Sequence, residues 1–91
     1  MKAFRAIVRG YVQGVGFRYS AVRMADKIGN ITGYIRNLPN GTIEVVAEGP
    51  EEKLNEFLDW LHHGPSSAIV ERVDVEWQPY SGQYNSFIVK F

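Results

Sequence analysis

The residues best suited to chemistry in this chain lie in one glycine-rich stretch, Gly10 to Arg18. Gly14 and Gly16 can adopt backbone conformations that a side chain would forbid, so several N–H groups can converge on one oxyanion. A strand-like segment precedes the stretch and a helical pattern follows it, and the N–H groups at the start of a helix attract negative charge. Arg18 adds a permanent positive charge with a planar geometry that suits phosphate. We therefore interpret residues 14–18 as a phosphate-binding loop.

The glycine pattern does not settle this interpretation by itself. An ordinary tight connection between a strand and a helix would use the same residues. The spacing matches neither the Walker pattern of nucleotide-binding loops nor the dinucleotide pattern GxGxxG. The elements that flank the loop distinguish the two interpretations.

Composition indicates one small globular domain over residues 1–91. The chain is 45% hydrophobic, which is enough for a core, and its ten basic and ten acidic residues cancel. This balance argues against a nucleic-acid or membrane-surface partner. The absence of cysteine excludes disulfides, thiolate catalysis and cysteine metal sites. Because the N-terminus has no long apolar run, we expect a soluble cytoplasmic protein. Because the chain is small and its charges balance, we expect a monomer.

Hydrophobic periodicity predicts the element order β-α-β-β-α-β with a final β segment. The expected strands cover residues 4–12, 31–38, 42–48, 69–77 and 87–91, and the expected helices cover residues 17–28 and 50–63. The apolar stripe of the second helix should consist of Leu54, Phe57, Leu58 and Leu61, and the strand over 69–77 should turn Val73, Val75 and Trp77 inward. This order predicts an α+β fold, a ferredoxin-like split βαβ sandwich with a mostly antiparallel sheet and two helices packed on one face. The strands flanking the first helix should run parallel and end at the same sheet edge. Asn37, near the end of the second of them, should therefore face the 14–18 loop.

Two segments resemble the two signatures of the acylphosphatase family. The first reads Val8-Arg9-Gly10-Tyr11-Val12-Gln13-Gly14-Val15-Gly16-Phe17-Arg18. The second reads Gly33-Tyr34-Ile35-Arg36-Asn37-Leu38-Pro39-Asn40-Gly41-Thr42-Ile43-Glu44-Val45, with Gly49 beyond it. Ile35 and Ile43 are bulkier than the family's usual residues there, and both are core-type changes. The resemblance covers essentially the whole chain.

The resemblance implies a hydrolase that converts acyl phosphates to carboxylate and phosphate, with no metal and no cofactor. It implies that Arg18 and the backbone N–H groups of the loop hold the phosphoryl group, while Asn37 orients the attacking water. The residues implied to bind phosphate are Gly14, Val15, Gly16, Phe17 and Arg18. An asparagine cannot accept a proton at neutral pH, so Asn37 can only position the water. The leaving carboxylate has a conjugate-acid pKa of roughly 4, so no general acid is required.

Several other polar and aromatic residues allow two interpretations. His62 and His63 could bind a metal or act as bases, but cations also suit the end of a helix, and we favour that second interpretation. Tyr11, Tyr19 and Tyr34 could line a substrate entrance or only cover the sheet and loop. We expect Gln13 to organise the loop. A further set could form a basic patch or be ordinary surface residues of strands: Arg5, Arg9, Arg36 and Lys90.

Proteins of other functional classes share this topology. RNA-recognition domains share this topology, but no segment matches their RNP1 pattern. A metal-carrying domain of this topology would need a cysteine pair. The nearest alternative is a phosphate-binding domain without catalysis, or one that handles carbamoyl phosphate as in a carbamoyl-transferring hydrogenase-maturation protein. Because the last strand-like segment ends at Phe91, we expect a stand-alone enzyme.

Overall fold

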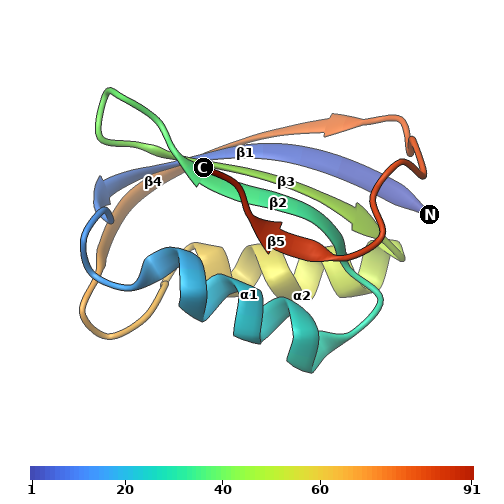
Figure 1. Ribbon diagram of the computed structural model, residues 1–91, viewed down its shortest axis with the longest axis horizontal. Coiled ribbons are helices and arrows are strands. Elements are labelled where there is room, and N and C mark those ends of the chain that lie inside the picture. Colours follow the sequence, from blue (N-terminus) through green and yellow to red (C-terminus); the bar gives the residue numbers. More distant parts are fainter.

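Five strands form one sheet, and two helices cover one of its faces (Figure 1). The computed structural model describes residues 1–91. The elements in chain order are β1 (Lys2–Tyr11), α1 (Phe17–Ile28), β2 (Thr32–Asn37), β3 (Ile43–Gly49), α2 (Glu51–Leu61), β4 (Ile69–Gln78) and β5 (Phe87–Val89). The predicted α+β architecture is confirmed. Neither helix has the length and apolar character needed to cross a bilayer.

The strand order in the sheet is β4-β1-β3-β2-β5. Strand β3 is antiparallel to both β1 and β2, so β1 and β2 run parallel to each other although they are not neighbours. Only the pair of β2 with β5 is parallel, so the sheet is mostly antiparallel, as predicted. The C-terminal ends of β1 and β2 therefore lie at the same end of the sheet, where Figure 1 also shows the β1–α1 loop and the β2–β3 hairpin.

The core forms where the alternating apolar residues of the central strands meet the helices. Phe4, Ala6 and Val8 of β1 are fully buried, as are Ile43, Val45 and Ala47 of β3. The predicted apolar stripe of α2 is buried against them and consists of Leu54, Phe57, Leu58 and Leu61. Removing one such side chain typically costs about 2–5 kcal/mol of stability, so this layer holds the site's framework in place.

The outer face of β3 is also buried, which simple alternation does not predict. Glu44, Val46 and Glu48 lie on the face away from the helices and are buried. The segment between β4 and β5 covers Glu48. The Glu48 carboxylate accepts hydrogen bonds from Ser81 Oγ at 2.6 Å and from the N–H of Gly82 at 2.9 Å. A central strand is thus covered on both faces even in a mostly antiparallel sheet.

Several predicted element boundaries were wrong. Pro50 precedes α2 with extended backbone (φ −60°, ψ 139°) and is not part of the first turn. On β4, Val75 and Trp77 lie opposite Ala6 and Phe4 on the face toward the helices, as predicted, but they are 37% and 46% exposed because β4 is an edge strand that the helices cover only in part. The last strand ends at Val89, and Phe91 beyond it is 91% exposed.

Candidate active site

The loop between β1 and α1 depends on two glycines with left-handed backbone. Gly14 has φ 75° and Gly16 has φ 78°, a region that costs other residues about 1–2 kcal/mol. A Cβ at either position would contact nothing within 4 Å, so only the backbone conformation requires glycine. The two glycines thus allow residues 13–16 to turn the chain from β1 directly into α1.

The N–H groups of residues 14–18 have no acceptor within the protein. None of them donates among the backbone hydrogen bonds outside regular elements, and the first turn of a helix has no intrahelical acceptor for them. Gly16 caps α1 without a side chain, and the first turn of α1 contains no acidic residue. By contrast, α2 has Glu51 and Glu52 in its first turn. The positive end of α1 is therefore left without a protein anion.

Arg18 increases this positive charge. It lies in the first turn of α1, where an acidic residue would be favoured by the helix dipole. Every other arginine side chain donates a hydrogen bond to a carboxylate or hydroxyl, and Arg18 donates none. Its guanidinium carbon lies 5.4 Å from the centre of the Phe91 ring and 6.0 Å from that of Tyr19. The guanidinium is therefore held by aromatic rings, with its hydrogen-bond donors free for an anion.

Asn37 ends β2 and has an unusual buried atom. Its side-chain oxygen Oδ1 is buried and accepts no hydrogen bond from any protein group. More than about 90% of buried polar groups in proteins are paired, so such an atom requires an explanation. An amide oxygen can accept a hydrogen bond from a water molecule. Asn37 thus has the free acceptor that water positioning requires.

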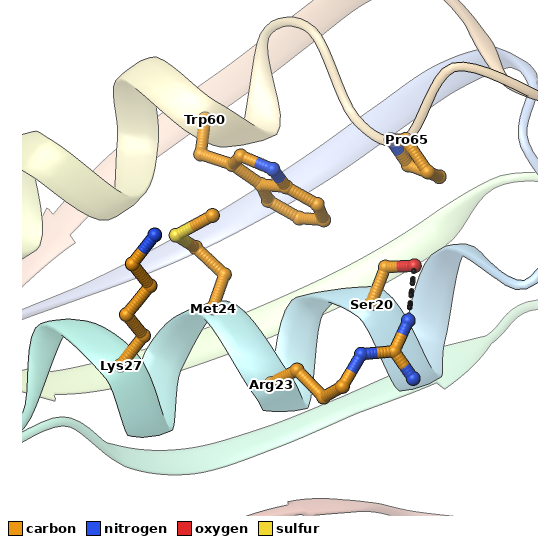
Figure 2. A pocket seen from close by; sticks show the side chains of 6 residues that line it. All are labelled: Ser20, Arg23, Met24, Lys27, Trp60 and Pro65. Atoms are coloured by element: carbon orange, nitrogen blue, oxygen red, sulfur yellow. Dashed lines mark hydrogen bonds between the residues drawn. The ribbon is translucent and has the colours of Figure 1, made fainter.

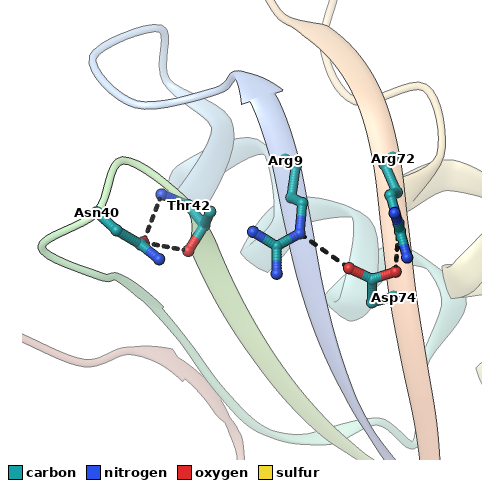
Figure 3. A network of polar contacts seen from close by, with 5 residues as sticks. All are labelled: Arg9, Asn40, Thr42, Arg72 and Asp74. Carbon is teal, nitrogen blue, oxygen red and sulfur yellow. Dashed lines mark hydrogen bonds and ion pairs between the residues drawn. The ribbon is translucent and has the colours of Figure 1, made fainter.

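Gln13 joins the loop to the β2–β3 hairpin. Its Nε2 donates to the carbonyl oxygens of Leu38 at 2.8 Å and Thr42 at 2.9 Å. The hairpin is itself closed by Asn40, whose Oδ1 accepts hydrogen bonds from Oγ1 of Thr42 at 2.6 Å and from its N–H at 3.1 Å (Figure 3). The loop therefore lies against the hairpin that follows Asn37. The prediction that Gln13 organises the loop is confirmed.

The four cations that could form a basic patch or be ordinary surface residues of strands all have partners. Arg5 and Arg36 each donate through Nε to Glu44, at 2.7 and 2.6 Å. Arg9 donates to Asp74 at 2.8 Å, alongside Arg72 (Figure 3). Lys90 places its ammonium nitrogen 4.5 Å from the ring centre of Tyr34. These residues behave as paired surface residues of strands.

The same ion pairs lower the pKa values of two carboxyl groups. Burial alone would raise the pKa of Glu44, but hydrogen bonds from Arg5 and Arg36 outweigh it, and the pKa lies below its usual value. Hydrogen bonds from Arg9 and then Arg72 lower the pKa of Asp74. Both carboxylates stay ionised at neutral pH. Both groups of ion pairs lie on the face of the sheet away from the helices.

The two histidines lie in the turn that ends α2. Nδ1 of His62 is 2.8 Å from the carbonyl oxygen of Leu58, and Nδ1 of His63 is 2.9 Å from that of Asp59. These contacts fit the interpretation as groups at a helix end. No cluster of three or more His, Cys, Asp or Glu side chains is placed to hold a metal ion.

The predicted tyrosines have different surroundings. Tyr11 and Tyr19 are 63% and 55% exposed, and Tyr19 lies beside Arg18. Tyr34 packs edge-on against Tyr84 with ring centres 6.0 Å apart, and burial is the main cause that raises its pKa. Tyr34 thus covers the sheet, while Tyr19 lies beside the guanidinium of Arg18.

Two surface hollows lie away from the loop. One of about 270 Å³ lies between α1 and α2 and is lined by Ser20, Arg23, Met24, Lys27, Trp60 and Pro65 (Figure 2). The other, of about 400 Å³, lies along β2 and β5 and includes Tyr34 and Tyr84. Neither includes residues 14–18 or Asn37. The 14–18 loop is therefore not part of either hollow.

One contact at the loop was missed by the sequence reasoning. Ser67 Oγ, in the turn between α2 and β4, donates to the carbonyl oxygen of Val15 at 2.7 Å. The Pro65-Ser66-Ser67 sequence is typical of a turn, but nothing in it indicates which distant segment the turn contacts.

Comparisons with known proteins agree with this fold. A profile of the acylphosphatase family matches residues 4–89. An acylphosphatase of Vibrio parahaemolyticus is 48% identical over 85 residues, which cover 90% of this chain and 93% of the relative. An acylphosphatase of Thermococcus kodakarensis is 49% identical over 84 residues, which cover 90% of this chain and 91% of the relative. The chain therefore belongs to the acylphosphatase family.

Solved structures extend the similarity to the backbone. The crystal structure of acylphosphatase from Bacillus subtilis superposes with a TM-score of 0.94 at 34% identity and covers 100% of both chains. The crystal structure of T. kodakarensis HypF matches with a TM-score of 0.84 at 36% identity, and the match covers 100% of this chain but 12% of HypF. The same fold therefore occurs both as a small protein and as part of a larger one.

Proposed function

We propose that this chain hydrolyses acyl phosphates, with the phosphoryl group bound by the 14–18 loop and the attacking water held by Asn37. The observation that carries the proposal is a coincidence of unpaired groups at one sheet edge. The N–H groups of residues 14–18 have no acceptor, Arg18 has no polar partner, and Asn37 Oδ1 is a buried acceptor without a donor. Donors for an anion and an acceptor for a water are the two requirements of this reaction. Membership of the acylphosphatase family supports the same conclusion.

Binding requires only groups that the protein already presents. The amides of residues 14–18 and the two terminal nitrogens of Arg18 can donate to phosphate oxygens together. These donors need no rearrangement as negative charge develops on those oxygens, so they stabilise the transition state. A guanidinium can contact two oxygens at once, which fixes the orientation of the phosphoryl group.

The chemical step then needs little from the protein. Water oxygen bonds to phosphorus while the bond from phosphorus to the acyl oxygen breaks, and the acyl group leaves as a carboxylate. Because Asn37 accepts a hydrogen bond from the water without taking its proton, that proton passes to an oxygen of the phosphoryl group. A carboxylate with a conjugate-acid pKa near 4 leaves without protonation. Positioning and electrostatic stabilisation therefore account for the rate.

The proposal is tested by the hydrolysis of benzoyl phosphate, followed by loss of ultraviolet absorbance in the presence of a chelator. We expect turnover by the unmodified protein and a fall in kcat/KM of about 1,000-fold or more in Arg18→Ala. Arg23→Ala is the matched control, since Arg23 lies on the same helix and donates only to Ser20. Absence of turnover by folded protein, or equal effects of the two substitutions, would contradict the proposal.

A second candidate is suggested by the match to a part of HypF. The chain would then bind phosphate, or act on carbamoyl phosphate, as a module of the kind found within larger proteins. The same assay with carbamoyl phosphate and acetyl phosphate in parallel distinguishes the two functions. Preference for carbamoyl phosphate by more than about 100-fold in kcat/KM would favour the second candidate.

The expected monomer and cytoplasmic location remain predictions. Light scattering of the purified chain measures the first, and fractionation of the source cells measures the second. A small-molecule substrate requires neither an oligomer nor a second protein at the loop.

A further inference from the structure

The turn after α2 lies directly behind the phosphate-binding loop. The N–H of Ala68 donates to the carbonyl oxygen of Pro65 at 3.0 Å, which places Ser66 and Ser67 at the two central positions of the turn. Figure 2 shows Pro65 where the chain leaves α2 beside the start of α1. Just before it, Gly64 has φ 68°, and a Cβ there would lie 2.5 Å from the Phe17 ring. The turn is therefore packed closely against the first residue of α1.

The two serines of this turn differ in one contact. Both are exposed, but Ser67 Oγ donates to the carbonyl oxygen of Val15 at 2.7 Å, whereas the side chain of Ser66 makes no hydrogen bond. This bond joins residues that are 52 positions apart. On the other side, Gln13 joins the loop to the β2–β3 hairpin. The loop is thus fixed by one side-chain contact on each side.

The contact of Ser67 determines the orientation of a peptide group in the loop. The carbonyl of Val15 and the N–H of Gly16 belong to one planar trans peptide, so they point in opposite directions. When Ser67 fixes the carbonyl, it also fixes the N–H of Gly16 on the side away from the turn. Because Gly16 is a glycine, its own conformational preference would not hold this peptide in one orientation.

We propose that Ser67 is a positioning residue that presets the Val15–Gly16 peptide for phosphate binding. This inference rests on the proposed function, because it assumes that the 14–18 loop binds the phosphoryl group. Without the hydroxyl, the loop adopts other orientations in the free protein, and phosphate binding must select the correct one. That selection weakens binding and leaves the chemical step of the bound complex unchanged.

The test compares Ser67→Ala with Ser66→Ala in the same turn. For Ser67→Ala, we expect the KM for benzoyl phosphate and the Kd for inorganic phosphate, measured by calorimetry, to rise together by about 5- to 10-fold. The value of kcat should change by less than about 2-fold, because the bound loop is ordered in both proteins. Ser66→Ala should match the unmodified protein. Ser67→Thr keeps a hydroxyl and should restore most of the phosphate affinity.

The outcomes separate this inference from the proposed function. An unchanged phosphate Kd in Ser67→Ala, or an equal change in Ser66→Ala, overturns the positioning role even if the protein is an active hydrolase. A loss of thermal stability in Ser67→Ala with unchanged phosphate Kd also overturns it, since the role would then be structural only. If the unmodified protein binds phosphate but hydrolyses nothing, the proposed function fails, while a weaker Kd in Ser67→Ala still supports the positioning role.

Discussion

Asn37→Ala should abolish most of the activity and leave the protein as stable as before or more stable. The side-chain oxygen of Asn37 is buried without a donor, and none of its side-chain atoms takes part in a hydrogen bond with the protein. Substitution by alanine therefore breaks no polar contact within the fold. It removes only the acceptor that is proposed to hold the attacking water.

The expected magnitudes follow from this environment. In the protein without substrate and its attacking water, a buried acceptor that no protein group satisfies costs about 1–3 kcal/mol, and the substitution removes this cost. The packing lost with a half-buried side chain of this size offsets about 1 kcal/mol of that gain. The free energy of unfolding should thus change by about zero to +2 kcal/mol, and each kcal/mol shifts the Tm of a domain of this size by about 4–8 °C. The value of kcat should fall about 100-fold or more, since water is no longer oriented.

Asn40→Ala is the matched control for this prediction. Asn40 lies in the hairpin that follows Asn37, and its Oδ1 accepts hydrogen bonds from the N–H and Oγ1 of Thr42. We expect Asn40→Ala to lose about 1–2 kcal/mol of stability and to keep its kcat, the reverse of Asn37→Ala. Urea denaturation and steady-state kinetics on the two variants provide the comparison. If Asn37→Ala is destabilised as much as Asn40→Ala, the Asn37 oxygen is paired in the folded protein and the reasoning is refuted.

Three further substitutions test other parts of the account. Because the folded pKa of Glu44 lies below its usual value of 4.5, the stability it adds is complete above pH 4.5 and is lost as pH falls through the folded pKa. Urea titrations should therefore show a weaker loss of stability in acid for Glu44→Gln, and an unchanged slope would contradict the ion-pair assignment. Gly10→Ala should destabilise by about 3 kcal/mol or more, because its Cβ would lie 2.1 Å from the carbonyl oxygen of Ile69; a Tm like that of the unmodified protein would refute this. Arg18→Lys keeps the charge but loses the planar pair of donors, so kcat/KM should fall about 10- to 100-fold, less than in Arg18→Ala. Equal losses in the lysine and alanine variants would show that charge alone contributes nothing.

Local sequence patterns predicted the helices and the loop well. Helix α1 covers the predicted residues 17–28, because apolar residues at helical spacing and Gly29 at its end are local signals. The proximity of the loop to the strand ending at Asn37 followed from topology, since the flanking strands of a split βαβ unit run parallel. These features depend on a few neighbouring residues or on a general rule of chain connection.

Features that depend on distant pairing could not be predicted. The exposure of Trp77 follows from the edge position of β4, which no pattern within that strand reveals. Arg18 has no hydrogen-bond partner, whereas carboxylates and a hydroxyl accept hydrogen bonds from the other arginines, and these pairings depend on the folded arrangement. The contact of Ser67 with Val15 joins two segments on different elements. Periodicity identifies which face of an element is apolar, but it does not identify what lies next to a given polar side chain.

The central claim, that water attacks a phosphorus atom held in the 14–18 loop, is tested most directly by hydrolysis in ¹⁸O-labelled water. Benzoyl phosphate is hydrolysed by the protein, and both products are analysed by mass spectrometry after subtraction of the uncatalysed reaction. The account predicts that the label enters phosphate, that benzoate contains none, and that Arg18→Ala loses the catalysed fraction. Label in benzoate would mean that water attacks the carbonyl carbon, which would contradict the roles given to the loop and to Asn37.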